Sequence, residues 1–394
     1  MTVSRREEIP PRGFPVEEFE TRTARAQKLL REQALDALLI MTEPEFAYFT
    51  GFNSYFWQSP TRPWFLVIPA KGKPVAIIPG IGENAVSQSW LDDIRVWTSP
   101  NPEDEGISLL AATLRELAPR HRRVGVPMGP ETHLRMPVND FQALRSGLSE
   151  LEIVDATSIV RDLRMVKSER EIAKLAHICS IVSDAYDNVP NIIRAGMSER
   201  EARNAFRIDV LSRGVDSAPY IVTTSARGGV DDAIRFPSER LLSDGDVVFV
   251  DTGAEIDGYY SDFDRNFAIG SASRETRSAY DLVYRATGSG IAAAVPGARM
   301  SDVWLAMAEV LASGGATGGS VGRMGHGVGL RNTEWPSVMK TDKTIIRPGM
   351  VLAIEPGFEF APGKIMLHEE NIVVREDGPQ LISRRAAPEL PVIR

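Results

Sequence analysis

The chain has 394 residues, 43% of them hydrophobic and 25% charged, and its 45 Lys and Arg against 53 Asp and Glu give a formal net charge of -8. This balance is typical of a folded globular protein of two or three domains, and a single cysteine excludes a disulfide scaffold. A mildly acidic chain has no general attraction for nucleic acid or anionic lipid, so neither is expected as a partner. The N-terminal segment lacks the apolar core of a secretory signal, and no apolar run approaches the roughly 20 residues that cross a bilayer, so we expect a cytoplasmic protein.

Helices and strands alternate along the first part of the chain. Helical periodicity is predicted over residues 16–33, 107–117 and 138–148. Buried strands are predicted over residues 35–41, 64–69, 74–79, 94–97, 123–127 and 151–154. Such alternation indicates an α/β layered N-terminal domain, which we place at residues 1–157.

Residues 158–394 show runs of helices and strands instead of strict alternation, which indicates an α+β domain. Helices are predicted over residues 168–182, 198–213, 274–291 and 300–312, and Ser198 with Glu201 fits a capping box at the start of the second. Strands are predicted over residues 220–224, 246–252, 262–269, 351–355 and 371–374. The Gly-rich residues 313–322 are expected to form a loop.

Acidic residues recur at the ends of these predicted strands. Asp251 ends the apolar run 247–250, Asp262 follows after a turn, Glu355 ends the strand that begins at residue 351, and Glu370 precedes the strand that begins at residue 371. His326 lies among small residues at 325–329, which let a backbone approach closely. Clustered carboxylates repel one another unless cations or protons compensate, and oxygen ligands with one imidazole suit Mn²⁺, Co²⁺, Fe²⁺ or Zn²⁺.

Four segments, residues 250–265, 325–330, 354–357 and 369–371, resemble in the same order the metal motifs of the pita-bread metallopeptidases. That superfamily includes methionine aminopeptidase, Xaa-Pro dipeptidase and creatinase. The resemblance implies a pita-bread catalytic domain over residues 158–394, a creatinase-type N-terminal domain with its tyrosine-containing turn at residues 48–51, and a homodimer. It also implies a divalent metal held by Asp251, Asp262, His326, Glu355 and Glu370.

Two positions depart from the peptidases of this superfamily. These peptidases carry a histidine shortly before the first metal motif, where this chain has Ile234, and another seven residues after the metal histidine, where it has Thr333. An imidazole can donate to a developing oxyanion or carry a proton, whereas isoleucine can do neither. The departures weaken the peptidase interpretation.

Glu255 lies four residues after Asp251 and therefore on the same face of an extended strand. It is either a solvated residue near the hairpin turn or a base or covalent nucleophile that acts beside Glu355 and His326. Asp264 is interpreted as a partner of a metal ligand or as an ion-pair partner of Arg265, since the motif's ligand position is already taken by Asp262.

Aromatic and basic residues supply a possible substrate wall. Trp335 and Thr333 follow the metal histidine closely, and Arg331 lies beside them; Trp64 and Arg62 lie in the N-terminal domain. Rings can face a delocalised cation and a guanidinium can pair with a carboxylate. For Trp64 the alternative is core or interface packing.

Residues 56–64, Glu255, residues 262–267 and residues 333–336 resemble the ectoine hydrolase branch of the superfamily. This resemblance implies a hydrolase that opens the cyclic amidine of ectoine or 5-hydroxyectoine at a C–N bond, giving N-acetyl-diaminobutyrate in compatible-solute degradation. The substrate is then a small zwitterion, and a downstream deacetylase is a possible partner. The alternative is a metal-dependent Xaa-Pro dipeptidase or aminopeptidase, and a third interpretation is a catalytically inactive pita-bread domain used for binding.

Overall fold

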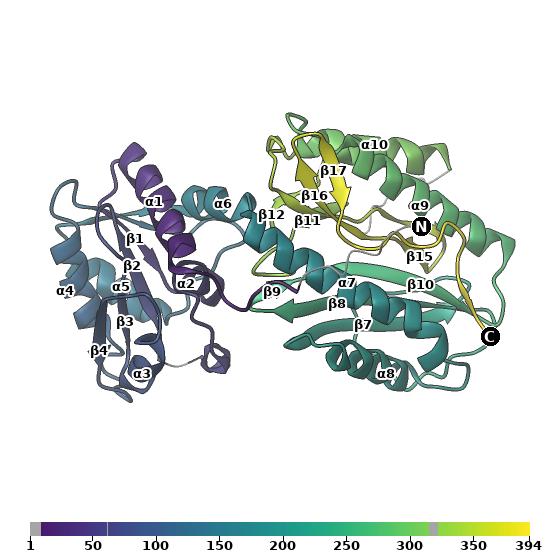
Figure 1. Ribbon diagram of the computed structural model, residues 1–394, viewed down its shortest axis with the longest axis horizontal. Helices are drawn as coiled ribbons and strands as arrows, with labels where there is room; N and C mark the ends of the chain where they lie inside the picture. The colour runs from purple at the N-terminus through teal and green to yellow at the C-terminus, as the bar shows by residue number, and fades with distance from the viewer. Residues whose placement is uncertain (1–8, 61, 315–321) are drawn as a thin grey trace. The chain divides into compact units, whose positions relative to one another are not determined.

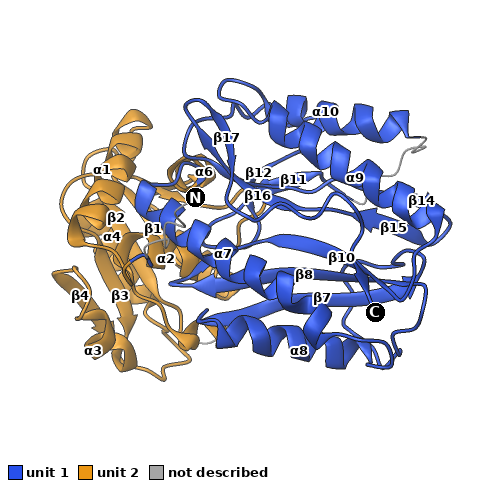
Figure 2. Ribbon diagram, turned by 45° about the vertical axis from the view of Figure 1, so that its right-hand side comes forward, with its two compact units in different colours: residues 1–10, 165–394 blue, residues 11–164 orange. Residues whose placement is uncertain are grey.

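The computed structural model describes residues 9–60, 62–314 and 322–394. It divides into two compact units: residues 11–164 form one, and residues 165–394 with residues 9 and 10 form the other (Figure 2). The predicted division after residue 157 falls at the start of helix α6, Thr157–Met165. Most of the predicted Gly-rich loop, residues 315–321, lies outside the described residues.

The N-terminal unit contains a six-stranded mixed sheet. Its strand order is β4 (Asp93–Trp97), β3 (Val75–Pro79), β2 (Phe65–Pro69), β1 (Ala37–Ile40), β5 (Arg123–Val126) and β6 (Glu152–Asp155). The pairs β1–β2 and β2–β3 are antiparallel, and the other three pairs are parallel. The helices of this unit are α1 (Val16–Glu32), α2 (Glu43–Thr50), α3 (Glu83–Val86), α4 (Ile107–Leu117), α5 (Val138–Gly147) and α6. The predicted α/β character is thereby confirmed.

The predicted tyrosine-containing turn is the last turn of a helix that the sequence analysis did not predict. Tyr48 lies in α2, and Gly51 closes that helix in the left-handed region with a φ of 72°. A side chain at Gly51 would meet the Phe19 ring at 2.6 Å, so glycine serves both the backbone and the packing here. The Tyr48 hydroxyl donates to the Leu163 carbonyl oxygen at 3.1 Å and ties α2 to α6.

The C-terminal unit is built on two sheets and a hairpin. The first sheet has the order β18 (Val392–Ile393), β10 (Phe263–Ile269), β8 (Asp246–Ile256) and β7 (Ser217–Arg227), and the short β9 (Tyr259–Tyr260) also pairs with β8. The second has the order β12 (Glu334–Ser337), β11 (Gly325–Gly327), β13 (Val351–Ile354), β16 (Glu370–Arg375) and β17 (Gly378–Leu381). Strands β14 (Gly357–Ala361) and β15 (Lys364–Leu367) form the hairpin.

Two pairs of helices flank these sheets: α7 (Glu169–Ile192) with α8 (Glu199–Ser212), and α9 (Arg274–Ala293) with α10 (Met300–Ser313). Figure 1 shows α7 and α8 along the sheet of β7, β8 and β10, and α9 and α10 on the side of the second sheet. The predicted capping box at Ser198 and Glu201 is present, and a second one joins Ser168 to Glu171. Helix α7 runs ten residues beyond its predicted end because buried Ala185 and Val189 continue its apolar stripe.

No helix within residues 9–60, 62–314 and 322–394 is long and apolar enough to cross a membrane. The core of the C-terminal unit is formed by apolar side chains of α9 and α10 packed against the second sheet, among them Val283, Met307, Leu352 and Ile372. This packing supports the second sheet, which carries or directly adjoins the candidate site residues His326, Glu355 and Glu370 as well as Thr333 and Trp335.

Candidate active site

The first sheet of the C-terminal unit contributes three carboxylates. Asp251 lies in the middle of β8, and Asp264 lies opposite it on β10 in the antiparallel register. Asp262 comes two residues before Asp264, so its side chain is expected on the same face of the chain. All three are buried. The pairing of β8 with β10 therefore gathers three acidic side chains on one face.

The second sheet contributes the other half of the cluster. His326 lies in β11, Glu355 directly follows β13, and Glu369 directly precedes β16. Since Ile354 pairs with Glu370, the next residues along the two strands, Glu355 and Glu369, come next to each other. The His326 Nε2 lies 3.6 Å from an Asp262 oxygen and 3.8 Å from a Glu369 oxygen.

Two sets of ligand atoms, each with its atoms within 4.8 Å of one another, are present in this cluster. The first set joins Asp262, His326 and Glu369, and the second joins Asp264, Glu355 and Glu369. Figure 1 shows the two source sheets side by side, with β8 and β10 in one and β11 and β16 in the other, and β10 contacts β16. Glu369 belongs to both sets and lies between them.

The glycines around His326 are required by the close approach of neighbouring strands. A Cβ on Gly325, whose φ is +136°, would lie 2.2 Å from the Ala353 carbonyl oxygen. A Cβ on Gly327 would lie 2.5 Å from the Trp335 carbonyl oxygen. Real side chains do not tolerate such contacts, so glycines alone allow β11 to lie between β12 and β13 with the imidazole turned to the carboxylates.

Burial and mutual repulsion disfavour the charged forms of these carboxylates. Burial raises the pKa of Asp251 to about 6 and, together with the Asp251 charge, raises that of Glu355 to about 8. The pKa values of Asp262, Asp264 and Glu369 are raised well above those of ordinary carboxyl groups, first by burial and then by the neighbouring carboxylates.

The pKa of the His326 imidazole is shifted downward, whereas those of the carboxyl groups are shifted upward. Burial, helped by the charge of Arg323, lowers the pKa of His326 to about 4, so its ring is neutral and has a lone pair to offer. One oxygen each of Asp251, Asp264 and Glu369 is buried without a hydrogen-bond partner among the described residues. Oxygen atoms without donors, gathered around a neutral imidazole, fit a divalent cation.

Glu370 does not join this cluster, contrary to the ligand set expected from the resemblance. Its carboxylate accepts from the Arg265 guanidinium at 3.0 Å and the Ala386 N–H at 2.9 Å, and also from the Ser383 hydroxyl. Burial alone would raise the pKa of Glu370, but the charge of Arg265 lowers this pKa to about 2. Neighbouring residues of a strand point to opposite faces, so Glu369 faces the cluster and Glu370 faces away.

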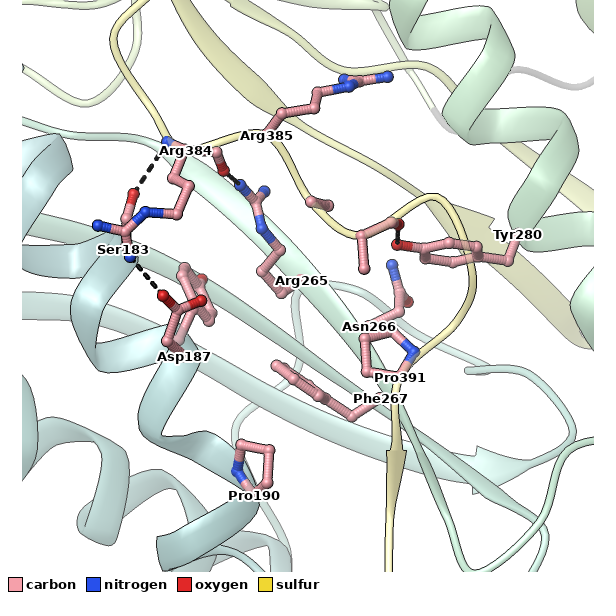
Figure 3. Close-up of a pocket in the computed structure, with 13 residues that line it drawn as sticks. Ser183, Asp187, Pro190, Arg265, Asn266, Phe267, Tyr280, Arg384, Arg385 and Pro391 are labelled. Atoms are coloured by element: carbon pink, nitrogen blue, oxygen red, sulfur yellow. Dashed lines mark hydrogen bonds and ion pairs between the residues drawn. The ribbon is translucent and has the colours of Figure 1, made fainter. Parts of the chain in front are cut away.

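Arg265 also borders a small cavity of about 180 Å³. Figure 3 shows its guanidinium between Arg384 and Tyr280. The described lining of this cavity includes none of the cluster residues. Of the two roles considered for Asp264, the structure does not favour the ion pair with Arg265: the guanidinium donates to the Asp264 backbone carbonyl at 2.6 Å and pairs with Glu370.

Glu255 lies on β8 but outside both sets of ligand atoms. Four residues along an extended strand place it about 13 Å from Asp251. Its carboxylate accepts from the Ser217 hydroxyl at 2.7 Å and from the Tyr260 hydroxyl at 3.3 Å. Its alternation with Asp251 holds along the strand, but its partners are residues of the neighbouring strands β7 and β9.

The residues expected to line the substrate pocket near His326 occupy mixed environments. Trp335 is partly buried and packs against the core of the C-terminal unit, and Thr333 is also partly buried. Arg331 is exposed, and its backbone N–H donates to Glu334 at 3.1 Å. Ile234, at the position of the first missing histidine, is 82% exposed.

Trp64 and Arg62 lie in the N-terminal unit. Trp64 is 3% exposed and stacks on Phe52 with ring centroids 5.1 Å apart, and Gly82 leaves room for its ring, since a Cβ there would lie 2.3 Å from Trp64. The Arg62 guanidinium lies over the Phe56 ring at 5.4 Å. Within its own unit Trp64 is thus a core side chain, which agrees with the packing alternative.

Two family models match the chain. Residues 173–376 match metallopeptidase family M24, and residues 22–166 match the creatinase/prolidase N-terminal domain. One match falls on each structural unit, and the match to family M24 includes every residue of the acidic cluster.

Several proteins with similar chains are named dipeptidases. The chain is 29% identical to a probable dipeptidase PepE of Mycobacterium tuberculosis over 93% of this chain and 95% of the relative. It is 26% identical to a Xaa-Pro dipeptidase of Pyrococcus furiosus over 61% of this chain and 68% of the relative. The crystal structure of dipeptidase PepE from Mycobacterium ulcerans matches with a TM-score of 0.84 at 27% identity, covering 97% of this chain and 100% of the other.

These relatives overturn the predicted opening of ectoine, because they are named dipeptidases and Xaa-Pro dipeptidases. The deacetylase partner and the role in compatible-solute degradation lose their basis with it. Three residues that were assigned to an ectoine site have structural contacts instead. Trp64 and Trp335 pack against the cores of their units, and the Glu255 carboxylate accepts a hydrogen bond from Ser217 on the neighbouring strand. The motifs that remain specific are those of the metal cluster, and the chain belongs to metallopeptidase family M24, with a creatinase/prolidase N-terminal domain.

Proposed function

We propose that this hydrolase is a metal-dependent dipeptidase that cleaves short peptides, with Xaa-Pro dipeptides as the first substrates to test. The observation that carries the proposal is the convergence of Asp262, Asp264, Glu355, Glu369 and His326 from two sheets of one unit, all of them buried except the partly buried Glu355. Asp251 lies outside these two sets, but it faces Asp264 across the strands and has one buried oxygen without a hydrogen-bond partner among the described residues. The names of the relatives that align over most of the chain support the same substrate class.

Five residues would hold the metal in this proposal: Asp251, Asp262, His326, Glu355 and Glu369. Carboxylates and a neutral imidazole are the donor set of Mn²⁺, Co²⁺, Fe²⁺ or Zn²⁺. When bound, such a cation supplies Lewis acidity toward a carbonyl oxygen and makes water more acidic. Glu369 takes the place that the resemblance gave to Glu370.

Glu355 is the residue proposed to move a proton, from the attacking water to the leaving nitrogen through its carboxylate oxygens. It is the one cluster carboxylate that is only partly buried, so it is the one that a substrate can approach. Arg331, exposed and close in sequence to the metal histidine, is proposed to pair with the substrate carboxylate. Thr333 and Trp335 are proposed to flank the peptide. Glu255 has no role in this proposal, because its carboxylate is bound by Ser217 and Tyr260 outside the cluster.

Ile234 and Thr333 define how this enzyme should differ from peptidases with two further histidines. Neither residue has an imidazole that could donate a hydrogen bond to the oxyanion that forms during peptide hydrolysis. Removing one such donor typically costs about 10²–10³-fold in kcat. We therefore expect slow turnover of dipeptides, with the cation and Glu355 supplying most of the catalysis.

The test is hydrolysis of Ala-Pro, Gly-Pro and Ala-Ala by chelator-treated protein resupplied with Mn²⁺, Co²⁺ or Zn²⁺, followed by chromatography of the free amino acids. The expected result is metal-dependent cleavage that His326→Ala abolishes. A Gly147→Ala variant, in helix α5 of the other unit with open space around its Cβ, is the matched control and should retain activity. A protein that binds these metals yet cleaves none of the three dipeptides would overturn the proposal.

The homodimer and the cytoplasmic location expected from the sequence remain proposals. Sedimentation equilibrium or light scattering of the purified chain tests the first, and fractionation of the source cells tests the second.

A further inference from the structure

Asp264 is a buried carboxylate that the five-residue ligand set leaves without a role. It lies on β10 directly opposite Asp251 on β8 and two residues after Asp262. One of its oxygens lies within 4.8 Å of ligand atoms of Glu355 and Glu369. Its position is therefore inside the cluster rather than behind it.

The hydrogen bonds of Asp264 satisfy only half of its carboxylate. The Oδ1 atom accepts from the Glu369 backbone N–H at 3.2 Å. The Oδ2 atom has no hydrogen-bond partner among the described residues, although the side chain is fully buried. The nearest imidazole nitrogen, Nδ1 of His368, lies 3.9 Å from Oδ1, which is too far for a hydrogen bond. A buried oxygen that is left unpaired is costly, so this one calls for a partner that the protein chain does not supply.

Protein cations do not provide that partner. The adjacent Arg265 pairs through its guanidinium with Glu370 and donates to backbone carbonyls, one of which is that of Asp264 itself. Across the strands, Asp264 meets the like charge of Asp251, an arrangement that destabilises a sheet unless it is compensated. The Arg265 charge favours the ionised form of Asp264, but it leaves Oδ2 without a hydrogen bond. A divalent cation held by the cluster would supply the partner that Oδ2 lacks.

We propose that Asp264 is an additional ligand of the metal centre, and that its Oδ2 binds a divalent cation held jointly with Glu355 and Glu369. This inference rests on the metal centre of the proposed function and extends it by a residue. An added carboxylate makes the donor set richer in oxygen, and oxygen donors suit hard cations such as Mn²⁺ better than Zn²⁺. The structure thus assigns this chain a centre biased toward Mn²⁺.

The experiment compares Mn²⁺ binding by the chelator-treated full-length protein and its Asp264→Asn variant, by isothermal titration calorimetry. Loss of an outer partner of a ligand already costs about 10–100-fold in metal affinity, so loss of a direct ligand should raise the Kd for Mn²⁺ at least that much. The Kd for Zn²⁺ should rise less. The matched control is Asp246→Asn, a buried aspartate on β8 that pairs with Arg240 outside the cluster, and it should leave both Kd values unchanged.

An Asp264→Asn protein that melts like the wild type without metal and binds Mn²⁺ with the same Kd and stoichiometry would overturn the proposal. If the variant does not fold, a crystal structure of the Mn²⁺-loaded wild type decides: an Asp264 oxygen coordinated directly to the ion supports the proposal, and an Asp264 separated from the ion by water overturns it. Because binding and coordination are read without turnover, these outcomes are separate from those of the dipeptide assay. If the enzyme cleaves no dipeptide but Asp264 coordinates the metal, the proposed substrate class is refuted and the proposed ligand role of Asp264 stands.

Discussion

Glu369 and Glu370 are neighbours in the chain, yet their carboxylates serve opposite purposes. Glu369 faces His326 and Asp262 in a cluster short of positive charge, whereas Glu370 is neutralised by Arg265 at 3.0 Å. The peptide bond between the two residues therefore separates a candidate metal ligand from a structural ion pair.

Glu369→Gln should weaken metal binding without loss of stability in the metal-free state, because burial and the neighbouring carboxylates already disfavour the charged form of Glu369 there and raise its pKa. We expect the Kd for Mn²⁺ to rise by about 10–100-fold or more. Glu370→Gln should instead destabilise the protein by about 3–5 kcal/mol, since it leaves the Arg265 charge buried and unpaired. Titration calorimetry and urea unfolding of both variants distinguish the two roles, and equal effects of the two substitutions on metal affinity would contradict this assignment.

The stability of the metal-free protein should fall as the pH rises from about 4 to 8. Asp251 and Glu355 have pKa values of about 6 and about 8 in the folded chain, above the values of about 3.9 and 4.3 in an unfolded chain. The folded state therefore binds more protons in this range, and the stability that those protons contribute is lost as they dissociate. A bound cation replaces the protons, so metal-loaded protein should gain in relative stability with pH.

Thermal melts of chelator-treated and Mn²⁺-loaded protein between pH 5 and 8 check this expectation. Glu355→Gln supplies the control, because an amide does not titrate and should flatten the decline of the metal-free melting temperature. A metal-free melting temperature that rises over this range would contradict the assignment of protons to the cluster.

Glu199→Gln should destabilise the protein at pH 7 and much less at pH 3. Burial alone would raise the pKa of Glu199, but hydrogen bonds from Arg235 and from Ser238 lower this pKa to about 2. A lowered pKa contributes stability above the unfolded value of about 4.3, and this contribution is lost as the pH falls toward 2. Charged hydrogen bonds of this kind contribute about 1.5–3 kcal/mol.

The comparison is made by urea unfolding at both pH values. Glu275→Gln is the matched control, because its partner Lys364 lies 3.9 Å away on the exposed surface and the pair contributes little. An equal loss of stability for Glu199→Gln at pH 7 and pH 3 would show that its charge is not what holds Arg235.

Gly325→Ala should disrupt the metal site through the backbone. The new methyl group would meet the Ala353 carbonyl oxygen at 2.2 Å at a φ of +136°, so β11 would have to move away from β13 and carry His326 with it. Overpacking of this kind costs about 1–3 kcal/mol. We expect a lower melting temperature together with weaker Mn²⁺ binding, whereas Gly147→Ala, with open space around its Cβ, should change neither by much. Unchanged metal affinity in Gly325→Ala would show that β11 does not position the imidazole.

The sequence by itself determined the features that depend on neighbouring residues. Binary patterning located most helices and strands, and the capping box at Ser198 and Glu201 marked the start of α8. The order of the motifs led to the superfamily. Acidic residues at the ends of predicted strands, together with His326, led to a metal cluster, and the structure brings Asp262, His326 and Glu355 of that prediction together. These signals are local, and local chemistry is read directly from the chain.

Tertiary structure decided which neighbouring carboxylate faces the metal site and which aromatic side chains are buried. The register of β13 with β16 turns Glu369 inward, and the pairing of β8 with β10 places Asp264 opposite Asp251. Side chains alternate with a period of two, so a slip of one residue would have exchanged Glu369 for Glu370, and only the pairing of strands distant in sequence fixes that choice. The burial of Trp64 likewise depends on Phe52 and Gly82, because packing is decided between segments and not within one.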